Sequence, residues 1–237
     1  MRKYKHLFFD LDNTLWDFRK NSYFALKISY LKYKDIIGEE DFDKFYAVYL
    51  RHNDRLWKGY RNGEVSKENL ILKRFGDTFQ ELRIAGIDAA EFNAAYLEEM
   101  PNQPCLVEGA SDILEYLHKK YSLYIITNGF REVQSKKLEN AGIKDFFKKI
   151  FISEIIKIHK PDPEIFIYAV QSVNARKSES LMIGDDPDVD IIGACRAGID
   201  QVYYSHDNQF GNSICEEENN RTRTFRINHL SQLCDFL

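Results

Sequence analysis

Residues 6–14 read HLFFDLDNT, a short apolar run that turns abruptly acidic and polar. An uninterrupted apolar run of this length is typical of a parallel strand that is covered on both faces. Asp10 and Asp12 follow the run directly. Because doubly wound sheets bind their ligands at the carboxyl ends of the strands, this stretch predicts a strand and a site at its end.

The second half of the chain repeats this pattern. From about residue 104 onward, short apolar runs alternate with amphipathic segments, which predicts βαβ units and an α/β fold with a doubly wound parallel sheet. The first strand must join that sheet, because one strand alone is not stable. The expected strands lie in YSLYIITNG (121–129), KIFISEII (149–156), SLMIGDD (180–186) and QVYYSH (201–206), and the polar residues 211–224 are expected to form an exposed loop.

Residues 16–103 have helical periodicity and no convincing strand. Within residues 42–60, aromatic and aliphatic side chains recur at helical spacing and define one apolar face, which we expect to serve packing. The sequence therefore predicts an α/β core domain of residues 1–15 and 104–237, with residues 16–103 inserted as a helical subdomain. Asn53 falls on the apolar stripe and is either a hydrogen-bonded core amide or a substrate contact.

The composition excludes several classes of partner. The formal net charge of -4 argues against a nucleic-acid polymer, because surfaces that bind one are usually strongly basic. No stretch approaches the ~20 apolar residues that a membrane span needs, so no membrane association is expected. Cys105, Cys195, Cys215 and Cys234 form no CxxC pair, which indicates free thiols and a cytoplasmic location. No feature points to a particular oligomeric state.

Polar clusters follow the later strands as well. A hydroxyl, a lysine and several carboxylates are thereby expected at one edge of the sheet. Phosphoryl transfer needs a nucleophile, a divalent metal held by oxygen ligands and positive charge near the non-bridging oxygens. A DxD sequence alone would equally suit a turn with a helix cap, so the prediction depends on the whole set. Its members are Asp10 and Asp12, Thr127 and Asn128, Lys160 and Pro161, and Gly184, Asp185 and Asp186, with Asp190 beyond.

In this order, the four clusters resemble the signatures of the haloacid dehalogenase-like hydrolases. The matching motifs are DLDNT (10–14), Thr127, Lys160-Pro161 and GDD (184–186). The insertion after the first motif resembles the helical cap of that superfamily. The resemblance extends over the full chain and implies a Rossmann-like core.

The resemblance also implies roles for the matched residues. Asp10 would attack phosphorus and form an aspartyl-phosphate, while Asp12 would act first as general acid and then as general base. Mg²⁺ would be held by the Asp10 carboxylate, the backbone carbonyl of Asp12 and Asp185. The phosphoryl oxygens would be bound by Thr127, Asn128 and Lys160.

Two features of these motifs bear on the reaction. In this superfamily, a second acidic residue follows the metal-binding aspartate by one or five positions. Both Asp186 and Asp190 qualify as this supporting residue, and Asp190 fits the GDxxxxD form best. Asp12 argues against dehalogenation, because a leaving halide needs no proton. Phosphomutases keep both aspartates and remain an alternative.

Three further segments resemble the pyrimidine 5′-nucleotidase branch of the superfamily. They are LWDF (15–18), HNDRLWKGYRNGEVSKENL (52–70) and TNGFREVQSKKLENAGI (127–143). This resemblance implies a small phosphate ester, a nucleoside monophosphate, as substrate. Phe18, Asn53 and Trp57 are candidate substrate contacts, since an aromatic ring can stack on a base. Alternatives are phosphoglycolate or a sugar phosphate as substrate, and a non-catalytic binding module, which the complete motif set argues against.

Overall fold

The computed structural model describes residues 3–205, 217–219 and 222–237. The chain divides into two compact units, one of Met1–Phe18 with Pro104–Leu237 and the other of Arg19–Gln103. Residues 16–18, which the sequence analysis placed in the insertion, thus group with the first unit. His206, Cys215 and most of the predicted loop lie outside the described residues.

Among the described residues, the first unit holds a seven-stranded sheet in the order β3-β2-β1-β4-β5-β7-β6. All neighbouring strands run parallel except β6, which is antiparallel to β7. The chain moves outward from β1 in both directions, which confirms the predicted doubly wound α/β fold. The strands are β1 (His6–Phe9), β2 (Ser122–Thr127), β3 (Phe147–Ile152), β4 (Ser180–Gly184), β5 (Asp200–Tyr204), β6 (Glu217–Asn219) and β7 (Thr222–Ile227).

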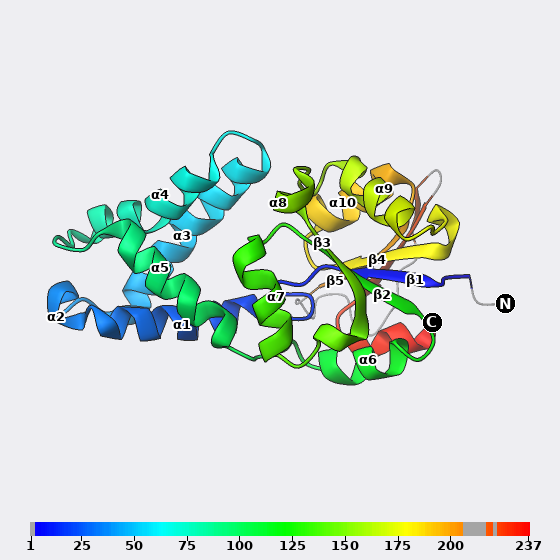
Figure 1. Ribbon diagram of the computed structural model, residues 1–237, viewed down its shortest axis with the longest axis horizontal. Helices are drawn as coiled ribbons and strands as arrows, with labels where there is room; N and C mark the ends of the chain where they lie inside the picture. The colour runs from blue at the N-terminus through cyan, green and yellow to red at the C-terminus, as the bar shows by residue number, and fades with distance from the viewer. Residues whose placement is uncertain (1–2, 206–216, 220–221) are drawn as a thin grey trace. The chain divides into compact units, whose positions relative to one another are not determined.

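Helices of the first unit flank the sheet, with α9 and α10 on one side and α6 on the other (Figure 1). Phe8 on β1 pairs in register with Tyr124 and Met182, and all three pack against α9 and α10. Because side chains alternate along a strand, Leu7 and Phe9 face the other side. The helical segments are α6 (Ala110–Leu117), α7 (Arg131–Asn140), η2 (Lys144–Phe146), α8 (Ser153–Ile156), α9 (Pro163–Ser172), η3 (Lys177–Glu179), η4 (Pro187–Ile191), α10 (Ile192–Ala197) and η6 (Leu230–Asp235).

Two local predictions are wrong. The run at 149–156 does not stay extended, since β3 ends at Ile152 and residues 153–156 form α8. The predicted loop at 211–224 contains β6 and the start of β7. Residues 222–227 (TRTFRI) mix polar and apolar side chains and are held as a strand by pairing with β5, a tertiary interaction that composition does not reveal.

The second unit contains α1 (Phe18–Lys32) from its second residue onward. Its other helical segments are α2 (Lys34–Ile37), α3 (Phe42–Arg61), α4 (Lys67–Leu82), α5 (Ala89–Glu99) and η1 (Met100–Asn102). Its core is aromatic: the ring centroid of Phe75 lies 5.0 Å from that of Tyr49 and 4.8 Å from that of Phe92. Phe45 and Tyr49 on α3 are fully buried, which confirms that the apolar stripe serves packing.

Two further expectations can be compared with the described part of the chain. None of its helices combines the length and the apolar character that a membrane crossing requires. Cys105, Cys195 and Cys234 are free thiols, as predicted.

Candidate active site

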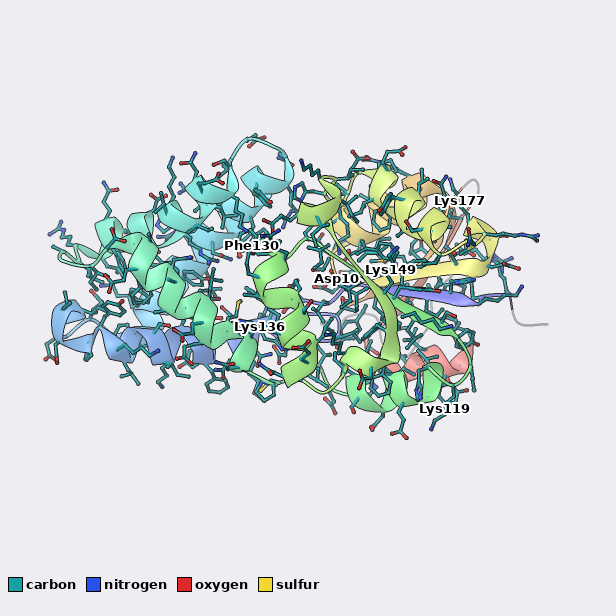
Figure 2. All side chains as sticks on the ribbon, viewed as in Figure 1. Asp10, Lys119, Phe130, Lys136, Lys149 and Lys177 are labelled. Atoms are coloured by element: carbon teal, nitrogen blue, oxygen red, sulfur yellow. The ribbon has the colours of Figure 1, made fainter. Side chains whose placement is uncertain are left out.

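The candidate site lies at the carboxyl ends of the central strands. Asp10 directly follows β1, and its backbone N–H donates to the Ile183 carbonyl of β4 at 2.8 Å. Thr127 is the last residue of β2, and Asp185 directly follows β4. Figure 2 shows Asp10 at this edge of the sheet. The parallel register of β1, β2 and β4 therefore brings together residues that are far apart in the sequence.

Lys160 is the buried cation of the site. Its ammonium lies 2.5 Å from Asp10 Oδ1 and 2.6 Å from Asp190 Oδ1, and it donates to the Ile126 carbonyl at 2.9 Å. Only 2% of the residue is exposed. Burial by itself lowers the pKa of Lys160, but the two carboxylates outweigh it and raise the pKa above the ordinary lysine value. The lysine is therefore held as a cation.

Three carboxylates gather around this lysine. Ligand oxygens of Asp10, Asp185 and Asp190 all lie within 4.8 Å of one another. Burial raises the pKa of Asp10 to about 7, and the nearby carboxylates of Asp190 and Asp12 add to the rise. The positive charge of Lys160 lowers this pKa but does not outweigh the other effects. Burial, Asp10 and Asp190 raise the pKa of Asp185 to about 8.

This cluster fits a divalent cation. Three carboxylates face one ammonium, so the ionised cluster carries an excess of negative charge that burial makes costly. Hard carboxylate oxygens are the ligands that Mg²⁺ takes in proteins. Both oxygens of Asp190 are already bonded, Oδ1 to the Lys160 ammonium and Oδ2 to the Asp186 backbone N–H at 3.2 Å, whereas Lys160 contacts only Oδ1 of Asp10. Asp10 and Asp185 are thus the carboxylates best placed for a metal.

Thr14 contacts the site and was not singled out in the sequence. It is fully buried, and its hydroxyl donates to Asp185 Oδ1 at 3.0 Å. The turn before it passes through Asn13, whose φ is 66°. Asparagine is one of the few non-glycine residues that adopt this left-handed conformation readily. Thr14 lies within the quoted DLDNT motif, so its position was the available signal.

Asp12 is held by two residues of α7 that sequence reasoning missed. Lys137 Nζ lies 2.7 Å from Asp12 Oδ1, and Gln134 Nε2 donates to Asp12 Oδ2 at 3.0 Å. Both side chains are buried. Val133 and Leu138 flank them on the buried side of the helix. The signal in the sequence was that Gln134 and Lys137 lie three positions apart, each next to an apolar residue, and so share the buried face of the helix.

Thr127 and Asn128 of the second motif are bonded to different neighbours, Thr127 to Gln134 of α7 and Asn128 to Lys160 of the third motif. Gln134 Nε2 donates to Thr127 Oγ1 at 2.6 Å, and the Gly129 N–H donates to the same oxygen at 3.1 Å. Asn128 Nδ2 donates to the Lys160 carbonyl at 2.9 Å, and the Lys160 N–H donates to Asn128 Oδ1 at 2.9 Å. The side chain of Asn128 thus fixes the backbone of Lys160. That the backbone N–H of Asn128 binds a phosphoryl oxygen remains a prediction.

The contacts of the fourth motif separate the two acidic candidates. Asp190 is buried and bonded to Lys160, whereas Asp186 accepts from the N–H groups of Asp188 and Val189 at 3.0 and 3.1 Å. Asp186 therefore caps its own turn. A Cβ at Gly184 would lie 2.5 Å from Asp190 Cβ, so only glycine allows this close approach.

The three candidate substrate contacts lie in different surroundings. Phe18 belongs to the first unit, with its ring centroid 5.7 Å from Lys137 Nζ and therefore near Asp12. Asn53 and Trp57 belong to the second unit. Asn53 is 2% exposed and accepts from the Tyr49 hydroxyl at 3.3 Å, as a hydrogen-bonded core amide would. Trp57 is half-buried against Tyr60. Substrate contact by these residues stays a prediction.

Comparison with known proteins relates this chain to nucleotidases and other phosphatases. It is 33% identical over 198 residues to the pyrimidine 5′-nucleotidase YjjG of Escherichia coli, covering 83% of this chain and 84% of YjjG. It is 31% identical over 209 residues to the glyceraldehyde 3-phosphate phosphatase of Pyrococcus furiosus, covering 87% and 82% of the two chains.

A solved structure is also similar along the whole chain. The crystal structure of YfnB from Bacillus subtilis, bound to magnesium, superposes with a TM-score of 0.84 at 28% identity and covers 99% of this chain and 98% of YfnB. The sequence model of the haloacid dehalogenase-like hydrolases matches residues 4–198. This chain belongs to the haloacid dehalogenase-like hydrolase family.

Proposed function

We propose that this protein is a magnesium-dependent phosphomonoesterase that hydrolyses nucleoside 5′-monophosphates through an aspartyl-phosphate intermediate. The observation that carries the proposal is the contact between Asp10 and Lys160 at the carboxyl end of β1, with Asp185 beside them. A carboxylate nucleophile, a fixed cation and a further metal-binding carboxylate are the parts that phosphoryl transfer requires.

In the first step, a carboxylate oxygen of Asp10 attacks phosphorus and the bond from phosphorus to the ester oxygen breaks. Asp12 gives its proton to that leaving oxygen. In the second step, the oxygen of a water attacks the same phosphorus and passes a proton to Asp12. The bond between phosphorus and Asp10 breaks, so Asp10 returns to a carboxylate and inorganic phosphate leaves.

Lys160 and Thr127 bind the phosphoryl oxygens in this scheme. Two N–H donors already point at Thr127 Oγ1, which leaves the hydroxyl hydrogen to be donated to a phosphoryl oxygen. Lys160 offsets negative charge on Asp10 as the phosphoryl group approaches. Mg²⁺ would be held by Asp10, Asp185 and the backbone carbonyl of Asp12. When bound, it supplies positive charge for the phosphoryl oxygens.

The nucleotide preference rests on likeness to YjjG, named a pyrimidine 5′-nucleotidase. Likeness to a glyceraldehyde 3-phosphate phosphatase favours a second candidate, a phosphatase of small sugar-like phosphates. A panel with Mg²⁺ tests both: nucleoside monophosphates, phosphoglycolate and triose and hexose phosphates, with inorganic phosphate measured. Fastest release from pyrimidine nucleotides is expected. Preference for a triose phosphate would favour the second candidate, and transfer to a sugar without phosphate release would identify a mutase.

Asp10→Asn tests the nucleophile. We expect it to abolish phosphate release with little loss of fold, because the amide keeps the shape of the side chain and cannot form the acyl-phosphate. Asp188→Asn is the matched control, since Asp188 is exposed on the fourth motif and should not affect turnover. EDTA should silence the wild-type enzyme, and Mg²⁺ should restore it. Undiminished turnover by the Asp10 variant would refute the proposed nucleophile.

A further inference from the structure

Helix α7 buries two polar side chains against Asp12. Gln134 is fully buried and Lys137 is 2% exposed. They donate to different oxygens of the Asp12 carboxylate, Gln134 to Oδ2 at 3.0 Å and Lys137 to Oδ1 at 2.7 Å. Two donors from one helix therefore fix both the position and the rotation of this carboxylate plane.

This arrangement is costly, which argues that it is more than packing. Both hydrogens of Gln134 Nε2 are used, one on Asp12 and one on Thr127. Among the described residues, its buried Oε1 has no hydrogen-bond partner, and an unpaired buried acceptor is destabilising. The opposite amide orientation would set this oxygen against the Asp12 carboxylate, which repels it. The amide is thus oriented by its donation to Asp12 and Thr127.

Lys137 is fixed by its surroundings as well. Its ammonium lies 4.2 Å from the centroid of the Trp16 ring and 5.7 Å from that of Phe18. An ammonium over an aromatic face is stabilised there by the ring quadrupole. With Asp12 on one side and the rings on another, Lys137 has little freedom to release the carboxylate.

The Gln134 amide occupies the space that a side chain at position 129 would need. A Cβ at Gly129 would lie 1.9 Å from Gln134 Nε2. The amide therefore packs directly on the loop that follows β2. Any larger residue at position 129 would push Gln134 away from Asp12 and Thr127 together.

We propose that Gln134 and Lys137 are positioning residues that aim the Asp12 carboxyl at the leaving oxygen and at the hydrolytic water. This inference rests on the proposed function and adds two residues to it. All the contacts lie within the first unit, so that unit alone sets the geometry of Asp12. In the first step the proton passes from Asp12 to the departing oxygen, and in the second step a proton returns from water to Asp12.

The test is a series of substituted phenyl phosphates, measured as kcat/KM with Mg²⁺. A nitrophenolate leaves readily without a proton, whereas phenolate depends on a well-placed acid. Because variants and wild type are compared on the same synthetic esters, the comparison can be made without knowing the natural substrate. The variants are Gln134→Leu and Lys137→Met. Lys136→Met is the matched control, because Lys136 is the neighbouring, exposed lysine on α7 (Figure 2).

For both variants, we expect kcat/KM for phenyl phosphate to fall by about 10- to 100-fold, which is part of the ~100- to 10,000-fold that general acid catalysis contributes, because Asp12 stays in place but is less well aimed. With dinitrophenyl phosphate the loss should be about threefold or less, because that step needs little proton transfer. Lys137→Arg, which keeps a cationic donor, should recover most of the phenyl phosphate activity. The control should match wild type on every ester.

The outcomes separate the two proposals. An equal loss on all esters in folded variants, or no loss, overturns the positioning role while the proposed function stands. A wild-type protein that releases phosphate neither from these esters nor from the natural phosphates of the substrate panel overturns both. Should Lys137→Met fail to fold by circular dichroism, the Gln134→Leu and Lys137→Arg results decide. Gly129→Ala, which displaces the Gln134 amide, should then reproduce the steeper dependence on leaving-group basicity.

Discussion

The ammonium of Lys160 stabilises a group of carboxylates that would otherwise repel one another. It contacts Asp10 and Asp190 at 2.5 and 2.6 Å and is almost completely buried. A buried ion pair gains little over an apolar alternative, but removing one partner leaves an unpaired charge. The carboxylate cluster therefore depends on this single side chain for its charge balance.

Lys160→Met should accordingly lower the free energy of unfolding by about 3–5 kcal/mol near neutral pH, since it leaves two buried carboxylates without their cation. Urea unfolding measures the loss. Lys177→Met is the control, because Lys177 is exposed (Figure 2) and its replacement should change stability by about 0.5 kcal/mol or less. Equal stability of the Lys160 variant and wild type would contradict this account.

Among the elements, helices α4 and α5 of the second unit begin at side-chain caps. Ser66 accepts from the Asn69 N–H at 3.2 Å at the start of α4. Asp88 accepts from the N–H groups of Ala90 and Glu91, both at 2.9 Å, at the start of α5. These caps satisfy donors that have no partner within the helix, so each fixes where its helix begins.

Asp88→Ala should destabilise the second unit by about 1 kcal/mol, because two N–H groups of the first turn lose their acceptor and a negative charge leaves the helix N-terminus. Asp88→Ser, which keeps a capping oxygen, should recover most of the loss. Chemical denaturation followed by circular dichroism measures both variants. An alanine variant as stable as wild type would show that water replaces the cap at no cost.

On the scale of the whole molecule, we expect the acidic cluster to make stability depend on pH and on Mg²⁺. The pKa of Asp10 is raised from 3.8 to about 7 and that of Asp185 from 3.8 to about 8. Between the ordinary pKa of 3.8 and the raised values of about 7 and 8, the folded state binds more protons than the unfolded state. The free energy of unfolding therefore falls as pH rises through this range. The contribution of these two protonated carboxyl groups to stability is therefore fully present below about pH 4 and is lost as pH rises through about 7 to 8.

In EDTA, we expect Tm to be lower at about pH 9 than at about pH 6 by roughly 8–16 °C, because ionising both carboxyl groups over this range costs ~4 kcal/mol in a protein of this size. Mg²⁺ should raise Tm most at the higher pH, because it binds the folded, ionised cluster. Differential scanning calorimetry measures these shifts. Asp185→Asn should flatten the pH dependence. A Tm that rises with pH in EDTA would reverse the assigned direction of both pKa shifts.

The sequence by itself determined the α/β class and the residues that close the central strands. Apolar runs that end in Asp10, Thr127 and Asp185 carry both signals, because a buried parallel strand and its polar end are local patterns. Local composition failed at residues 222–224, which were predicted as loop but begin the strand β7 that pairs with β5. It also left open the choice between Asp186 and Asp190.

Only the tertiary structure brought Gln134 and Lys137 to Asp12 and Thr14 to Asp185. Helical periodicity shows that residues 134 and 137 share one face of α7, but it cannot show what that face meets. Hydrogen bonds and ion pairs between distant residues depend on how elements pack, to within a few tenths of an ångström. The sequence therefore specifies the elements and the chemically active groups, and packing decides which groups act together.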